Sequence, residues 1–270
     1  MRLRRMRRCL GTALAACASL AFFTACSNGQ EDKGGTFFGP PQSIGNGTVK
    51  TYATLDKSGN PTEVGVRMSA ASLDGLPQED AVPPQMLVLA FPRQASATAF
   101  DHVMLNWNSH GHQPVELFGK PHFDIHFYMV NPAAVAGIDP SKPSFATQAA
   151  NLPGRKYIPQ DYVLPPGSPA ENVVPGMGLH WVDATDGLEP GKYDFKQTLI
   201  VGSWDGAYTF IEPMMTREWM LTKQSVDEKI KQPQAYQKNS YYPTTYTVHY
   251  DDQANAYSVA LGGMTMRHAS

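Results

Sequence analysis

The chain has 270 residues, of which 42% are hydrophobic and 17% are charged, and its formal net charge is −2. That length can bury a sizeable core as one large domain or two small ones, and we favour one. No basic cluster lies beyond the first few residues, which argues against a nucleic-acid partner.

Residues 1–25 are expected to be a signal peptide. Five arginines precede an apolar run over residues 9–25, which is too short for a membrane-spanning helix. Removing this leader takes away five of the 22 basic residues and none of the 24 acidic ones, leaving 17 against 24, a net charge of −7. The mature chain is therefore expected to be acidic and exported.

The leader ends in the letters F-T-A-C, which resemble a bacterial lipobox with Cys26 as the lipidated residue. This predicts a lipoprotein held to a membrane by its N-terminal lipid, in the cell envelope, facing the periplasm or the cell exterior. Cys17 closes a second lipobox-like run, and cleavage without lipid is a further alternative. All three cysteines precede residue 27, so the mature chain has no disulfide.

Residues 26–47 are rich in Gly, Pro, Ser and Asn and predict a flexible tether, followed by a single β-rich domain over residues 48–268. Three segments predict antiparallel hairpins, because β-rich arms flank short polar turns. They are residues 48–69, residues 194–212 with an Asp-Gly turn, and residues 246–261.

Residues 121–130 read P-H-F-D-I-H-F-Y-M-V and alternate strictly between two kinds of side chain. A period of two predicts a β-strand. One register is apolar and suits a core. The other holds His122, Asp124, His126 and Tyr128, which places imidazole, carboxylate and phenol groups on one surface.

Residues 132–178 contain many prolines and predict a long irregular excursion, with one helical turn near residues 144–150. Residues 216–231 are the best helix candidate, because Thr216 suits an N-cap and Pro233 follows the end. With many expected strands and one such helix, the fold class is mainly β: an antiparallel sandwich or barrel with one helix near residues 216–231.

Four motifs are distinctive in letters and spacing. They are N-W-N-S-H-G-H-Q-P at residues 106–114, P-H-F-D-I-H-F-Y at 121–128, G-M-G-L-H-W-V-D at 176–183 and F-I-E-P-M at 210–214. On these motifs the chain resembles an uncharacterised family of exported bacterial proteins, described as a domain of unknown function. The resemblance covers most of residues 48–267 and implies a mostly β fold without an established activity.

The histidines and one glutamate predict a metal site on the sheet, with zinc or another divalent transition metal as the ion. The candidate ligands are His122, His126, His180, Glu212, His110 and His112, and the residues expected behind them are Asp124 and Tyr128. Residues four apart on a strand are about 13 Å apart, so His122 and His126 would share an ion only across a bulge or bend. A buried hydrogen-bond network without metal is one alternative, and a metal-free catalytic dyad is another.

Three functions remain open on these residues. The first is an exported lipoprotein that binds a metal on its β-sheet. The second is a metal-dependent hydrolase or lyase, in which an open coordination position would be needed. The third is a non-catalytic envelope or stress-related assembly module that forms a homo-oligomer through the proline-rich excursion.

Overall fold

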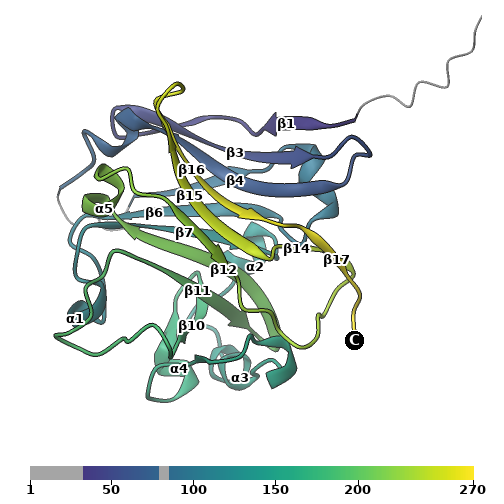
Figure 1. Cartoon of the computed structure of the whole chain (residues 1–270). Helices are drawn as coiled ribbons and strands as arrows, with labels where there is room; N and C mark the ends of the chain where they lie inside the picture. Colours follow the sequence, from purple (N-terminus) through teal and green to yellow (C-terminus); the bar gives the residue numbers. More distant parts are fainter. Residues whose placement is uncertain (1–32, 79–84) are drawn as a thin grey trace, which may run out of the picture. The chain divides into compact units, whose positions relative to one another are not determined.

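The computed structural model describes residues 33–78 and 85–270, which form two large antiparallel sheets. Every pairing between named strands is antiparallel. The sheets pack as a sandwich, and neither closes into a barrel within these residues (Figure 1). The predicted mainly β fold is confirmed, and of its two alternatives the chain adopts the sandwich.

The first sheet has seven strands in the spatial order β1-β3-β4-β16-β15-β13, with β2 paired to β3. Its strands are β1 (Gly35–Phe38), β2 (Gln42–Ile44), β3 (Gly47–Leu55), β4 (Pro61–Ser69), β13 (Val226–Lys229), β15 (Thr245–Asp251) and β16 (Ala256–Gly262). The β3–β4 and β15–β16 pairings confirm the first and third predicted hairpins.

The second sheet has eight strands in the order β5-β6-β7-β12-β11-β10-β8, with β9 paired to β10. Its strands are β5 (Gln85–Ala90), β6 (His102–Asn108), β7 (His122–Tyr128), β8 (Tyr162–Val163), β9 (Val173–Val174), β10 (Gly178–Asp183), β11 (Gln197–Trp204) and β12 (Ala207–Thr216). The β11–β12 hairpin is also confirmed. Asp205 and Gly206 have φ of 45° and 77° at its turn, as a type I′ turn requires.

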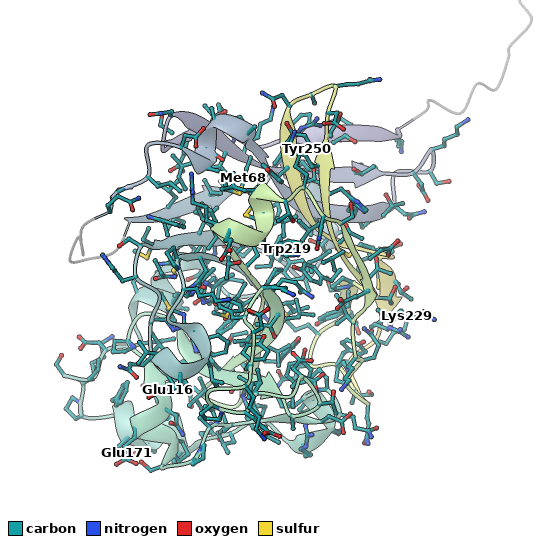
Figure 2. All side chains as sticks on the ribbon, turned by 60° about the vertical axis from the view of Figure 1, so that its left-hand side comes forward. Met68, Glu116, Glu171, Trp219, Lys229 and Tyr250 are labelled. Carbon is teal, nitrogen blue, oxygen red and sulfur yellow. The ribbon has the colours of Figure 1, made fainter. Side chains whose placement is uncertain are left out.

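The main core lies between the two sheets. Its fully buried members come from the facing registers of both, including Val64, Val66, Met68, Val259 and Leu261 from the first sheet and Val103, Leu105, Phe123, Ile125 and Phe127 from the second. Met68 is labelled in Figure 2. A two-stranded sheet completes the fold, with β14 (Ser240–Tyr242) and β17 (Thr265–Arg267).

The eight-stranded sheet is also covered on its outer side. The short helices are α1 (Val115–Phe118), α2 (Pro132–Ala136), α3 (Phe145–Ala150), α4 (Pro169–Asn172) and α5 (Arg217–Leu221), and three 3-10 helices span Ala70–Leu73, Arg93–Ala97 and Arg155–Tyr157. In Figure 1, α1, α3 and α4 lie on the side of this sheet that faces away from the seven-stranded sheet. Phe118, Val135 and Phe195 of the covering segments form a second core with the sheet. Both faces at the centre of the sheet are therefore buried.

The helix expected over residues 216–231 is confirmed only at its start. The Thr216 hydroxyl accepts a hydrogen bond from the Trp219 amide at 3.2 Å, as an N-cap does. The helix α5 then ends at Leu221, and Lys223 adopts φ of 58°. The rest of the predicted helix was wrong. Val226–Lys229 is strand β13, because pairing with β15 and burial of Val226 override local helix propensity.

The flexible tether expected over residues 26–47 is wrong in its later part. Strands β1 and β2 pair with β3, and the buried Ile44 side chain belongs to the main core. Backbone pairing and one apolar anchor give this Gly-rich segment its order. The expected signal peptide, Cys26 and residues 27–32 lie outside the described residues. No helix in the described part of the chain is long and apolar enough to cross a membrane.

Candidate metal centre

Strand β7 confirms the predicted alternation, with Phe123, Ile125 and Phe127 in the main core. The polar register faces the outer side of the sheet but is not exposed to solvent. His122 and His126 are fully buried, and Asp124 is 4% exposed. Because the segments covering the sheet exclude water, each polar group on this face needs a partner within the protein or a bound ion.

His126, His180 and Glu212 meet on this buried face from three strands, β7, β10 and β12. His126 Nε2 lies 3.4 Å from His180 Nε2 and 3.3 Å from Glu212 Oε1. His180 Nε2 lies 3.5 Å from Glu212 Oε2. We call these three residues the deep group. The His180 side chain is 17% exposed, so this member of the deep group lies at the edge of the covered face.

Hydrogen bonds within the deep group leave some of its buried polar atoms without a partner. His180 Nδ1 lies 3.2 Å from the Gly178 carbonyl, which can only accept, so Nδ1 carries the hydrogen and Nε2 is bare. His126 Nδ1 and Glu212 Oε2 are buried without a hydrogen-bond partner in the described residues. One proton could serve only one of these contacts. A cation at the centre of the group would coordinate both imidazole nitrogens and the Glu212 carboxylate.

Burial sets the charge of each member of the deep group. It lowers the pKa of His126 to about 3, with the neighbouring His180 adding to the effect, and lowers the pKa of His180 to about 4. Burial also raises the pKa of Glu212 well above its usual range, and the charge of Asp124 adds to that. Both imidazoles are therefore neutral at pH 7, the form in which histidine binds metals.

The spacing of the deep group fits a tetrahedral ion. An ion with bonds of about 2.1 Å to nitrogen and oxygen holds its ligand atoms about 3.4 Å apart, along the edges of a tetrahedron. The two imidazole nitrogens, 3.4 Å apart, match one such edge. The Glu212 carboxylate lies 3.3 Å from His126 Nε2 through Oε1 and 3.5 Å from His180 Nε2 through Oε2. These distances exceed the usual length of an N–H···O hydrogen bond. The donor set of two imidazoles and one carboxylate suits zinc and its neighbours in the transition series.

Phe210 and Gly202 hold the two histidines of the deep group in place. The Phe210 ring lies 4.9 Å from both imidazole rings, measured between centroids. It lies directly over Gly202 of β11, where any Cβ would overlap it. Gly202 pairs with both Phe210 and His180, so its missing side chain makes room for the ring between β10 and β12.

A second group lies nearer the start of β7 and contains His112, His122 and Asp124. His122 Nε2 is 3.0 Å from Asp124 Oδ1, and His112 Nε2 is 3.4 Å from Asp124 Oδ2. We call these residues the outer group, since the His112 side chain is 38% exposed. Asn108 of β6, which the sequence analysis did not single out, donates to Asp124 Oδ2 at 2.7 Å. The sequence feature that could have identified Asn108 is its position in the N-W-N-S-H-G-H-Q-P motif.

The structure thus divides the predicted set of ligands. His122 and His126 do not share a group, because alternate residues of a straight strand point in parallel and four positions separate these two. Asp124 lies among the potential ligands of the outer group and contacts His122 but belongs to no group with His126. Tyr128 stacks on His126 and donates to the Met177 carbonyl at 3.2 Å. His110 is exposed and falls in neither group, and its Nδ1 lies 3.1 Å from Ser109 Oγ.

One family model matches the chain, over residues 56–107, and its description is "TTHB210-like: Hypothetical protein TTHB210". The match is to an uncharacterised family and ends before the first residue of either group. No curated protein and no solved structure matched the chain. The geometry of the two groups therefore carries the functional argument.

Proposed function

We propose that this protein binds a divalent transition metal, zinc foremost, through His126 Nε2, His180 Nε2 and the Glu212 carboxylate. The observation that supports this most strongly is the convergence of the three side chains: the two Nε2 atoms are 3.4 Å apart, and the Glu212 oxygens Oε1 and Oε2 lie 3.3 Å and 3.5 Å from them. Two further features agree with it. The imidazoles are neutral, and Glu212 Oε2 has no hydrogen-bond partner among the described residues. A bound ion replaces the missing hydrogen bonds.

Metal analysis of the chain without residues 1–26 tests the proposal. The protein is stripped with a chelator, loaded with zinc, dialysed and analysed for bound metal. At least one tightly held equivalent is expected, and Glu212→Gln should lose it. Less than about 0.2 equivalents in the loaded wild-type protein would overturn the proposal. A copy with Glu116→Gln is the matched control, because Glu116 is an exposed carboxylate on α1 (Figure 2).

A metal-dependent hydrolase or lyase is the second candidate, supported by the number of ligands. The deep group offers three protein donors, whereas structural zinc sites usually have four and catalytic sites three. In such a site the ion supplies Lewis acidity, and Glu212 and the two imidazoles hold it in the water-poor face of the sheet. Cobalt-loaded protein tests this candidate. Azide should change the visible spectrum of the cobalt protein if one coordination position is open. An unchanged spectrum would rule out the metal-dependent hydrolase or lyase.

We also propose that the metal site belongs to an exported lipoprotein of the cell envelope. The arginine-rich apolar leader and the cysteine at position 26 support this, and so does the lack of cysteine after that position. The net charge of −7 without the leader supports the absence of a nucleic-acid partner.

Oligomer formation through residues 132–178 would give the non-catalytic assembly module. Sedimentation as a strict monomer across micromolar concentrations would count against that module.

A further inference from the structure

We propose that the outer group, His112, His122 and Asp124, is a second and independent metal site, more open to exchange with solvent than the deep group. The two groups share no residue. The proposal therefore stands or falls separately from metal binding by His126, His180 and Glu212.

The hydrogens of the outer group point away from its centre. His122 Nδ1 lies 2.6 Å from the Lys120 carbonyl, and His112 Nδ1 lies 2.8 Å from the Gln113 carbonyl. Carbonyl oxygens only accept, so both Nδ1 atoms carry hydrogen, and in the neutral rings both Nε2 atoms present lone pairs. These lone pairs face Asp124, whose oxygens also only accept when it is ionised. Backbone carbonyls fix the tautomer of metal-binding histidines in the same way.

The centre of the outer group holds unpaired buried atoms. His122 Nε2 and Asp124 Oδ1 are 3.0 Å apart, and both are buried without a hydrogen-bond partner in the described residues. An ionised carboxylate and a lone pair repel each other at this distance. A divalent ion between them turns the repulsion into two coordination bonds.

The surroundings make the outer group a built site with one open side. The Phe195 ring packs against His122 at 5.1 Å, and the Phe118 ring packs against His112 at 5.8 Å, between centroids. Gly111, with φ of 71°, brings His112 over the strand, and a Cβ there would overlap the Phe118 carbonyl. His112 is carried by this turn and is 38% exposed, so it can move more readily than the ligands on strands.

Ligand chemistry defines what the outer group would take. Two imidazole nitrogens and a carboxylate suit a borderline divalent ion such as zinc, cobalt or nickel, and fit magnesium or calcium poorly because those prefer oxygen ligands. The third ligand lies on a partly exposed turn, so the ion should exchange faster than in the deep group. We therefore expect two classes of bound metal, one slow and one fast.

Zinc stoichiometry and exchange separate the two sites. Equilibrium dialysis of the wild-type protein should give two equivalents, of which one is removed quickly by a chelator. His112→Ala should bind one slowly released equivalent, and Glu212→Gln should keep one quickly released equivalent. His249→Ala is the matched control, because it removes an exposed histidine of β15 in the seven-stranded sheet. This variant should still bind two equivalents of zinc.

Asp124→Asn is the second variant, chosen because it should remove a ligand while the protein still folds. The Asn side chain keeps the shape, can accept from Asn108 and can donate to His122 Nε2, so the metal-free fold should survive with an unchanged circular dichroism spectrum. It should lose the fast equivalent. One equivalent in the wild type that both His112→Ala and Asp124→Asn retain, or two equivalents in both variants, would overturn the second site. Loss of both equivalents in Glu212→Gln would overturn its independence. If Glu212→Gln still binds two equivalents, and His112→Ala loses one, the second site stands and the function proposed for the deep group fails.

Discussion

The Nε2 atoms of His126 and His180 lie 3.4 Å apart on the buried outer face of the eight-stranded sheet, and Glu212 approaches each of them. The residues come from strands β7, β10 and β12, so the arrangement depends on the sheet as a whole. Burial keeps both imidazoles neutral, as their lowered pKa values indicate.

Removing the Glu212 charge should weaken zinc binding strongly. Changes to groups behind a ligand cost about 10–100-fold in affinity, and loss of a ligand should cost at least about 100-fold. Competition with a chromophoric chelator measures this for Glu212→Gln. Equal affinity of Glu212→Gln and the wild type for the tightest zinc equivalent would show that Glu212 is not a ligand. Glu116→Gln should leave the affinity unchanged.

The metal-free protein should lose stability on acidification from pH 6.5 to 4.5. In this window the unfolded chain protonates His126 and His180, whose usual pKa is 6.5, while in the folded chain their pKa values are about 3 and about 4, respectively. Glu212 opposes this by one proton, because its folded pKa is raised from 4.5. His102, whose pKa burial also lowers, adds to the loss.

His112, whose pKa is raised, opposes the loss near pH 6.5. The net difference therefore grows from near zero at pH 6.5 to about one proton below about pH 5.5, where the free energy of unfolding should fall by about 1.4 kcal/mol per pH unit. Urea unfolding of chelator-treated protein at the two pH values measures it. A free energy that stays level or rises on acidification would contradict the assignment of neutral, buried histidines.

Gly202→Ala should disturb the deep group through Phe210. A Cβ at this position overlaps the Phe210 ring, which packs against both histidines. Overpacking of this kind costs about 1–3 kcal/mol of unfolding free energy, and the tight zinc affinity should fall with it. Gly154→Ala is the control, since its Cβ would make only ordinary contacts with Tyr157. Wild-type stability and affinity in Gly202→Ala would show that Phe210 does not position the ligands.

Cys26→Ser should release the protein from the membrane. Expression of the full chain in a bacterial host, followed by fractionation, should find the wild type with membranes and the variant in the soluble fraction. Cys17→Ser, at the other lipobox-like run, should behave as the wild type. If instead Cys17→Ser is released and Cys26→Ser is retained, the anchor is at residue 17. A soluble wild type would favour cleavage without lipid.

Much of the fold could be predicted from the sequence because its signals are local. Alternation over residues 122–128 and the Asp205–Gly206 turn depend only on neighbouring residues, and β7 and the β11–β12 hairpin are as expected. Where the helix predicted from residue 216 ends is not decided by neighbouring residues. Strand β13 forms because β15 lies beside it, and residues more than 15 positions away decide that pairing.

For the candidate site, the sequence alone determined which residue types were present and which face of β7 they occupy. The sequence predicted His126, His180 and Glu212 as candidates and indicated that His122 and His126 are too far apart to share an ion on a straight strand. Only the tertiary structure decided the partners. Strand order brings β10 within reach of β7 across two hairpin-linked strands, and the turn after Gly111 returns His112 to Asp124. Such contacts depend on strand order and on the packing of covering segments, which periodicity does not encode.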